Sequence, residues 1–311
     1  MTLDSGLTSS QEIAAGLQAA LPDLVEADSL SLLTAGANSV VVQSKSGYIF
    51  RVGRNQRSFE TYQKESALLP IVSSAVDIAV PVPDCLVDPT LTIPYGAIGY
   101  KKLPGRPLSD AKGCVDRGRI AGQLGEFVHQ LHSIPVECLR VIDLPEYRSR
   151  PRALASLWEQ LAPYLDAHFT PSEIRSLEDW LEDRRRDDQM QDYQPCLIHG
   201  DLACWNVLVD DRTSVVSGIV DFEAACIGDP ADDLLMQRKL DDAFYDEVVT
   251  AYQDKSGQIE PSFGHRVHHL QVLRLVFSLL FHAEAGDYEQ VAKSIRKLRK
   301  TEIFSPPTPV S

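Results

Sequence analysis

The sequence predicts an α+β fold with two lobes, a small β-rich N-terminal lobe and a larger, mostly helical C-terminal lobe. The chain has 311 residues, which exceeds what one hydrophobic core usually fills. A β-hairpin pattern occupies residues 39–52, and helical spacing dominates residues 230–300. Between them, Leu103-Pro-Gly-Arg-Pro107 interrupts every periodic pattern and marks a boundary. We therefore expect an N-terminal lobe at 1–102, a C-terminal lobe at 103–304 and a disordered tail at 305–311.

Short-range patterns predict the elements of the N-terminal lobe. Residues 11–20 have the spacing of a short amphipathic helix. Ser39-Val-Val-Val-Gln43 and Tyr48-Ile-Phe-Arg-Val52 flank a Ser-Gly turn, which is typical of a hairpin. Residues 57–72 return to helical spacing, and residues 97–102 suit a further strand.

The C-terminal lobe begins with an unambiguous helix that ends before Pro135. Residues 153–188 are mostly helical, with a break near Thr170-Pro171, and residues 196–220 contain two short apolar runs around a polar turn. The apolar face of the first helix recurs at Ile120, Leu124, Phe127, Val128 and Leu131.

The net charge limits the possible partners. The chain carries 30 Lys and Arg against 44 Asp and Glu, a net charge of −14. Binding of nucleic acid or of an anionic membrane requires clustered basic residues, so neither is expected as a partner. The acidic surface suits a cationic or neutral small molecule, although solubility alone would also explain it.

The chain lacks the features of secreted, membrane or redox proteins. Its first ten residues are polar, and the densest apolar run, Leu270–Phe281, is interrupted by Gln271, Arg274 and Ser278. No Cys-x-x-Cys pair suggests zinc or redox chemistry. We expect a cytoplasmic protein with reduced thiols at Cys85, Cys114, Cys138, Cys196, Cys204 and Cys226.

One group of residues in the sequence indicates a catalytic site. The stretch Ile198-His-Gly-Asp-Leu-Ala-Cys-Trp-Asn206 has the spacing H-x-D-x-x-x-x-N, in which protein kinases use Asp as the base and Asn as a metal ligand. Asp221 follows at the end of an apolar strand, and the hairpin between Asn206 and Asp221 folds the chain back so that both can bind one hard cation. Each residue alone could cap a turn or end a strand, but their order and β-context favour a shared site.

This pattern resembles the aminoglycoside phosphotransferase family, small-molecule relatives of the protein kinases, which shows H-G-D-x-x-x-x-N followed by I-D-(F/W)-x. Gly228-Asp-Pro-Ala-Asp-Asp-Leu234, Leu131-His-Ser-Ile134 and Gly99-Tyr-Lys-Lys-Leu-Pro-Gly105 resemble further family segments. The resemblance implies a protein-kinase-like fold with a five-stranded sheet and a nucleotide cleft between the lobes. It further implies Mg²⁺-dependent transfer of the γ-phosphate of ATP or GTP to a hydroxyl. The residues implied are Asp201 and His199 for catalysis and Asn206 and Asp221 for the metal.

The resemblance also implies nucleotide contacts in the N-terminal lobe. Arg51 stands where the family usually has Lys, and Glu65 on the next helix is its expected partner, with Glu60 as a rival. The loop between the first two strands has a single glycine, so it is not the protein-kinase G-x-G-x-x-G. No G-x-x-x-x-G-K-[ST] is present, which argues against a P-loop kinase. The further expected contacts are Gly36, Asn38, Ser39, Tyr100 and Lys101.

Several other polar residues invite functional readings. His132 lies just past an apolar helix face, where a hydrogen-bonded structural histidine is expected. Asp229 is expected to tie the catalytic loop in place, and Trp205 either packs under that loop or walls the acceptor pocket. His265, His268 and His269 have a spacing that could bind metal, yet no carboxylate lies close in sequence, so we interpret them as surface or core-edge residues.

The acceptor is the least determined feature, because fold resemblance does not fix a substrate. An aminoglycoside-type antibiotic is favoured, with a macrolide, a metabolite such as choline, homoserine or a sugar, or a catalytically silent nucleotide-binding protein as alternatives. A cationic acceptor would be attracted by carboxylates after Asp221, whereas Leu270–Phe281 could supply an apolar groove for a macrolide. These carboxylates are Asp232, Asp233, Asp241, Asp242, Asp246 and Glu247.

Overall fold

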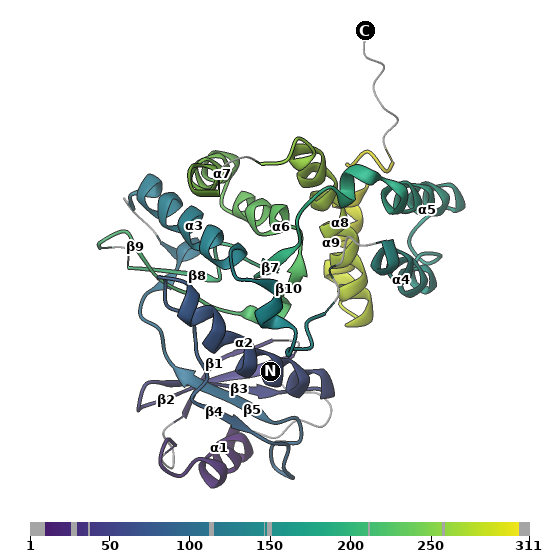
Figure 1. Cartoon of the computed structure of the whole chain (residues 1–311). Helices are drawn as coiled ribbons and strands as arrows, with labels where there is room; N and C mark the ends of the chain where they lie inside the picture. Colours follow the sequence, from purple (N-terminus) through teal and green to yellow (C-terminus); the bar gives the residue numbers. More distant parts are fainter. Residues whose placement is uncertain are drawn as a thin grey trace.

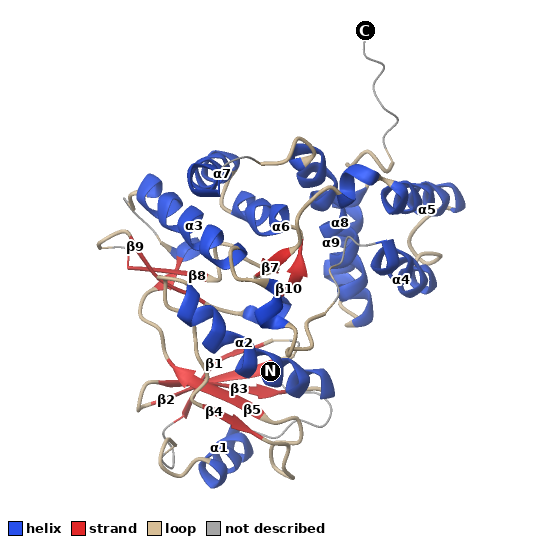
Figure 2. Cartoon of the chain, viewed as in Figure 1, coloured by secondary structure: helices blue, strands red, loops and turns tan. Residues whose placement is uncertain are grey.

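The protein folds into two lobes joined side by side (Figure 1). The structure, a computed structural model, describes residues 10–25, 30–36, 38–111, 115–145, 147, 151–210, 212–256 and 259–304. A β-sheet forms most of the N-terminal lobe, whereas helices dominate the C-terminal lobe (Figure 2). The predicted α+β two-lobe fold is confirmed. The tail predicted to be disordered, 305–311, lies outside the described residues.

The N-terminal lobe is built on a five-stranded antiparallel sheet in the order β1-β2-β3-β5-β4. Helix α1 packs on the face of the sheet remote from the C-lobe, and α2 lies between the sheet and the C-lobe (Figure 2). The elements are α1 (Ser10–Ala20), β1 (Leu30–Ala35), β2 (Ser39–Ser44), β3 (Tyr48–Gly53), α2 (Gln56–Ala75), β4 (Cys85–Val87) and β5 (Ala97–Lys101).

The β2–β3 hairpin forms where the alternating pattern predicted it. Val40 and Val42 are buried in the N-lobe core while Val41 between them is only partly buried, as expected for period-two alternation. Gly47 closes the turn with a φ of 84°, a left-handed conformation that favours glycine. The resulting register pairs Val41 with Arg51, which fixes Arg51 in the middle of the sheet.

Helix α2 connects the two lobes. It begins at a capping box in which Asn55 accepts from the backbone N–H of Ser58. Further along, Leu68, Leu69 and Val72 are fully buried in the same apolar cluster as the C-lobe helix α3. Although α2 comes from within residues 1–102, part of its apolar face therefore belongs to the C-lobe core.

The C-terminal lobe contains two small antiparallel sheets among its helices. One has the order β6-β8-β9 and the other pairs β7 with β10. The strands are β6 (Arg106–Pro107), β7 (Cys196–Ile198), β8 (Val207–Asp210), β9 (Val215–Ile219) and β10 (Cys226–Gly228). The helices are α3 (Arg117–His132), α4 (Pro151–Leu161), α5 (Pro171–Arg186), α6 (Pro230–Leu235), α7 (Asp242–Ser256), α8 (Phe263–Glu284) and α9 (Tyr288–Leu298).

The chain passes from one lobe to the other through a short connection. It leaves the N-lobe sheet at Lys101 and pairs with β8 of the C-lobe from Arg106 onward. The boundary between residues 102 and 103 remains a prediction. No helix among the described residues is both long enough and apolar enough to cross a membrane.

Helices α3 and α7 approach closely at one glycine, which gives a test of the packing. A Cβ added at Gly125 would lie 2.6 Å from Cβ of Ala251 and 2.7 Å from the backbone N of Tyr252, whereas one added at Gly122 meets nothing within 4 Å. We expect Gly125→Ala to lower the free energy of unfolding by about 1–3 kcal/mol through overpacking. Gly122→Ala, on the same helix, should raise it by up to about 1 kcal/mol. Urea unfolding followed by circular dichroism measures both, and equal effects would contradict this packing.

Candidate active site

The loop of residues 199–206, which we call the catalytic loop, connects β7 to β8. Its glycine is required by the fold. Gly200 has a φ of 78°, and a Cβ there would lie 2.4 Å from the carbonyl oxygen of Ala224. No other residue fits this close approach, which explains the Gly between His199 and Asp201.

A fully buried carboxylate holds the catalytic loop in place. Asp233 accepts hydrogen bonds from the backbone N–H groups of His199 (2.8 Å) and Gly200 (2.9 Å). Its Oδ2 also lies 3.3 Å from Nε2 of His132, so His132 has the structural role predicted for it. Burial opposes the charge on Asp233, but His132, His199 and the N–H groups outweigh it and lower the pKa of this carboxyl.

Asp233 has the role that sequence reasoning assigned to Asp229. Asp229 instead caps α6 through the N–H of Ala231 (2.9 Å) and pairs with Nε of the fully buried Arg266 on α8 (2.8 Å). It therefore joins α6 to α8 and has no contact with the catalytic loop. The prediction for Asp229 was wrong because both aspartates are buried at the start of α6, Asp229 as its N-cap and Asp233 in its first turn, and only the fold decides which one faces the loop.

His199 is a positioning residue. Its side chain is fully buried, Nε2 lies 3.0 Å from the carbonyl oxygen of Val220, and Nδ1 accepts from the N–H of Asp201 at 3.2 Å. Both ring nitrogens are thus used by the backbone, and the ring packs against Phe222. We therefore infer that His199 fixes the catalytic loop against the Asp221 segment. The catalytic role that the resemblance implied for it has no support in these contacts.

Asp201 points its carboxylate into a polar shell at the mouth of this loop. Asn206 donates to its Oδ2 at 3.1 Å, and the indole N–H of Trp205 reaches the same oxygen at 3.4 Å. Nη1 of Arg274 on α8 lies 3.9 Å from Oδ1. Burial raises the pKa of Asp201, and the charge of Arg274 opposes that rise. Trp205 therefore walls the site and contacts the expected base.

Asn206 and Asp221 come together as oxygen donors. The amide nitrogen of Asn206 is used in bonds to the backbone and side chain of Asp201, which leaves its amide oxygen for another partner. The N–H of Val220 donates to the carbonyl of Asn206 at 2.9 Å and brings Asp221 alongside. Asp221 has a φ of 70°, a left-handed conformation unusual for a non-glycine residue, and its side chain is about half exposed. Such strain is found at functional sites, and an amide and a carboxylate oxygen suit Mg²⁺.

Arg51 joins three elements of the cleft. From β3 it binds both oxygens of Glu65 on α2 at 2.8 Å, and its Nη2 lies 3.0 Å from Glu223 and 3.9 Å from Asp221. Burial works against its charge, but Glu65 and then Asp221 outweigh it and raise the pKa of Arg51. The predicted Arg51–Glu65 pair is confirmed, while the rival Glu60 is exposed and lines the cleft.

Glu223 is a site residue to which sequence reasoning gave no role. Besides its bond to Arg51, its carboxylate accepts from the amide of Asn38 in the β1–β2 loop. Lys64 on α2 donates to the carbonyl oxygens of Glu223 (2.6 Å) and Ala225 (3.2 Å), and burial lowers the pKa of this lysine. The sequence feature that could have indicated this role is the position of Glu223, two residues after Asp221 in the same short motif.

The remaining residues expected at the nucleotide lie in different environments. Gly36 is exposed and donates its N–H to the carbonyl of Ser39, which is buried. Tyr100 is half-buried on β5, where burial raises its pKa to about 12 against the opposing effect of Arg51. Lys101 is exposed and lines neither of the two cavities described next. Their contact with a nucleotide stays a prediction.

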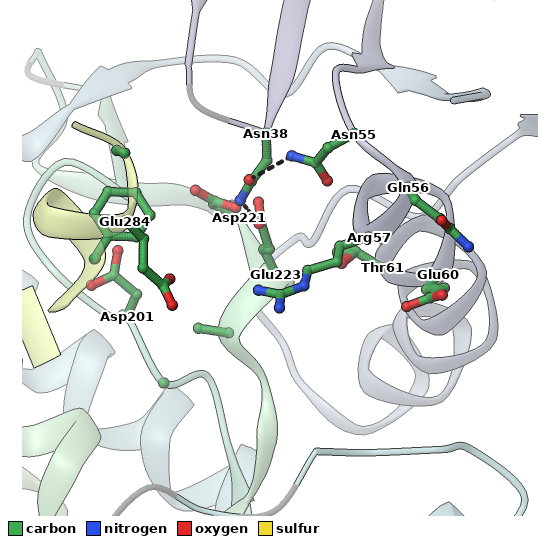
Figure 3. Close-up of a pocket in the computed structure, with 14 residues that line it drawn as sticks. Asn38, Asn55, Gln56, Arg57, Glu60, Thr61, Asp201, Asp221, Glu223 and Glu284 are labelled. Carbon is green, nitrogen blue, oxygen red and sulfur yellow. Dashed lines mark hydrogen bonds between the residues drawn. The ribbon is translucent and has the colours of Figure 1, made fainter. Parts of the chain in front are cut away.

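Two cavities share Asp201 in their linings, together with Arg57, Phe281 and Glu284. The larger, about 1110 Å³, is the cleft between the lobes. Figure 3 shows Asp221 and Glu223 in the centre of this cleft, with Asn38 above them, Asp201 and Glu284 on one side and the start of α2 on the other. The second, about 710 Å³, lies between the catalytic loop and α8. Aromatic side chains of Trp205, Phe277 and Phe281 line it together with Met236, Leu280 and the polar residues Arg57, Lys239, Arg274, His282 and Glu284.

The acidic cluster predicted to attract a cationic acceptor does not line either cavity. Asp232 is buried against Arg274 (2.8 Å), and Asp233 holds the catalytic loop. Asp241 pairs with Arg117 of α3 at 2.7 Å. Sequence reasoning could not foresee these pairings, because the net charge of a segment does not reveal which of its carboxylates are already paired, and attraction of a cationic acceptor by this segment stays a prediction. Asp242 pairs with Arg238, and Asp246 and Glu247 line a surface hollow beside α3.

A comparison with protein-family models accounts for this arrangement. The model of the phosphotransferase enzyme family, APH, matches residues 29–266, which include the catalytic loop, Arg51 and Asp221. The chain belongs to the phosphotransferase enzyme family. It is accordingly a small-molecule kinase of the protein-kinase-like fold, as the resemblance of its motifs implied.

Solved structures of this family share the fold over nearly the whole chain. The GDP and kanamycin complex of APH(2″)-IIIa has a TM-score of 0.81 and 21% identity, and the match covers 94% of this chain and 98% of that one. The streptomycin–ATP complex of APH(2″)-IIa gives 0.73 and 18%, covering 96% and 99%. The macrolide 2′-phosphotransferase MphH from Brachybacterium faecium gives 0.67 and 23%, also covering 96% and 99%. At identities this low, the structural match establishes the fold alone.

Arg274 provides a test of how the phosphotransferase holds Asp201. It donates to the carbonyl of Gly200 at 2.7 Å and forms a two-pronged pair with Asp232 at 2.8 and 2.9 Å. Arg274→Lys keeps the charge but loses this fork. We expect kcat to fall by about 10²-fold, since a small displacement of a reacting group costs that much, with the nucleotide KM nearly unchanged. The control Arg299→Lys breaks a similar fork to Glu173 on the surface. Steady-state kinetics with equal kcat in the two variants would contradict this role.

Proposed function

We propose that the chain transfers the γ-phosphate of a nucleoside triphosphate to a hydroxyl of a small molecule, with Asp201 as the base. One observation carries the proposal. Asp201 lines both the cleft beside Asp221 and the aromatic cavity beside α8. A donor in the first and an alcohol in the second would meet at this carboxylate. Because Asp201, Asn206 and Asp221 are brought together, a catalytically silent protein is disfavoured.

The chain's own residues account for the transfer step. The acceptor oxygen attacks the γ-phosphorus, the bond to the β-phosphate oxygen breaks, and the hydroxyl proton passes to Asp201. Trp205 and Asn206 hold the carboxylate of Asp201 in one orientation, and Arg274 favours its anionic form. Arg51, fixed by Glu65, lies against Glu223 and Asp221 of the cleft lining, and we propose that its guanidinium meets the α- and β-phosphates there.

The metal expected is Mg²⁺, held by the amide oxygen of Asn206 and the carboxylate of Asp221. When bound, it would neutralise the charge of the phosphates. The fit rests on the strained backbone of Asp221 and on the free amide oxygen of Asn206. The names of the structural relatives include complexes with GDP and with ATP, which supports a nucleoside triphosphate as donor.

The lining of the second cavity bears on the acceptor. The relatives are aminoglycoside and macrolide phosphotransferases by name, and the acidic cluster that favoured a polycation lies elsewhere. Trp205, Phe277 and Phe281 offer an apolar wall, and Lys239 adds a positive charge. We therefore propose an acceptor with a broad apolar face and few amines, macrolide-like in these respects. An aminoglycoside is the second candidate, since Glu284 in the same cavity could bind one ammonium group.

A screen of acceptors tests this function. Nucleotide turnover should be stimulated by one class among macrolides, aminoglycosides and common hydroxylated metabolites, with ATP and GTP tried separately. Asp201→Asn keeps the shape but cannot accept the proton, so we expect kcat to fall roughly 10²–10⁴-fold with nucleotide binding little changed. Near-normal kcat in this variant would rule out Asp201 as the base. An acceptor KM that rises steeply with salt would favour the aminoglycoside candidate over the apolar one.

The metal assignment has its own test. Asp221→Ala should abolish turnover and weaken the affinity for the Mg²⁺–nucleotide complex at least about 10-fold, because phosphate charge would remain uncompensated. Isothermal titration calorimetry with a non-hydrolysable nucleotide measures the affinity with and without Mg²⁺. Asp254→Ala, an exposed carboxylate on α7, is the matched control. If Mg²⁺ strengthened nucleotide binding equally in both variants, the metal would lie elsewhere.

A further inference from the structure

Three histidines on α8 have no part in the proposed function. His265, His268 and His269 line neither the cleft nor the second cavity. Their i, i+3, i+4 spacing places them together near the start of the helix, and no carboxylate is close to them in sequence. The fold supplies two from distant segments, Asp187 just after α5 and Glu302 near the end of the described chain.

The donor atoms converge at one place. Nε2 of His265 lies 2.7 Å from Oδ2 of Asp187, and one ligand atom from each of Asp187, His265 and His269 lies within 4.8 Å of the others. Tetrahedral coordination at bond lengths of 2.0–2.2 Å separates ligand atoms by roughly 3.4 Å, so the donors need to shift by only about an ångström. His269 is buried while Asp187 and His265 are partly exposed, which leaves a path for an ion from solvent.

His269 is already oriented as a ligand would be. Its Nδ1 lies 3.4 Å from Oε1 of Glu302, which in turn accepts from the indole N–H of Trp180. Metal-binding histidines commonly donate their second nitrogen to such a carboxylate, which fixes the ring and leaves the other nitrogen for the metal.

We propose that Asp187, His265 and His269 form a site for a divalent transition metal, with Zn²⁺ as the preferred ion. Glu302 would hold the ring of His269 in place without binding the metal. Two imidazoles and one carboxylate are a common zinc donor set, and the fourth position would be taken by water. The ion would fasten the end of α5 to α8. The ion would take no part in the proposed phosphoryl transfer, because its ligands line neither of the cavities that contain Asp201.

Arg184 is the competitor for this site. Its Nη1 lies 3.1 Å from both ring nitrogens of His269, and its Nε lies 3.6 Å from Asp187. The lone pairs of Nδ1 and Nε2 point away from each other. Nη1 of Arg184 is equally far from both nitrogens and therefore lies along the direction of neither lone pair. The guanidinium therefore opposes an ion by charge without occupying the ligand position. Removing that charge should strengthen binding.

Titration of the nucleotide-free protein with Zn²⁺ against a chromophoric chelator tests the proposal. We expect one ion per chain and a higher melting temperature with Zn²⁺. His265→Asn, which alters the more exposed ligand and should fold, should weaken binding by more than the roughly 10–100-fold that loss of an outer-shell partner costs. In Glu302→Gln, the loss of Zn²⁺ affinity should fall within that range of about 10–100-fold. Arg184→Gln should bind Zn²⁺ more tightly than the natural sequence.

Two controls identify the ligands. His282→Asn, on the same helix but outside the cluster, should bind Zn²⁺ normally. Substitution of Co²⁺ should give the absorption of a tetrahedral nitrogen and oxygen site without a thiolate charge-transfer band, which excludes the cysteines as ligands. Absence of stoichiometric binding, a thiolate band, or equal affinity in His265→Asn and His282→Asn would each overturn the proposal.

Discussion

The architecture of the cleft depends on one buried arginine. Arg51 is 7% exposed, and its guanidinium is surrounded by carboxylates from α2 and from the segment after β9. Removing one partner from a buried ion pair leaves an uncompensated charge, which costs about 3–5 kcal/mol. The sheet, α2 and the Asp221 segment therefore keep the positions in which Glu65 and Glu223 both reach Arg51. The binding of nucleotide and metal proposed above depends on this arrangement.

Sequence reasoning succeeded where the determining information is local. The β2–β3 hairpin follows from alternating valines and a glycine turn, and the helix that begins near residue 57 follows from its apolar spacing. The catalytic loop is defined by the five-residue separation of Asp201 and Asn206, which the fold preserves. In each case, the geometry is set by residues close together in the chain, so a pattern in the sequence suffices.

The errors share a physical cause, which is that a charged residue's partner is chosen by tertiary structure. Asp229 and Asp233 are four residues apart and both fully buried, yet Arg266 takes one and the catalytic loop takes the other. The acidic segment looked like a field for cations, although Asp232 was already neutralised from α8. Arg274 was visible only as an interruption of an apolar helix, and a buried arginine in such a position is itself a signal of a partner.

Helix α2 packs in the cores of both lobes, which limits how far it can move. In protein kinases, the helix that carries the glutamate partner of the nucleotide-binding cation is positioned when the enzyme is activated. Here that helix inserts Leu68, Leu69 and Val72 into the C-lobe core and binds the Asp221 segment through Lys64. Rotating it outward would expose three fully buried side chains, at about 1.5–3 kcal/mol each. Such a displacement is therefore costly in this chain, and the packing of α2 holds Glu65 against Arg51.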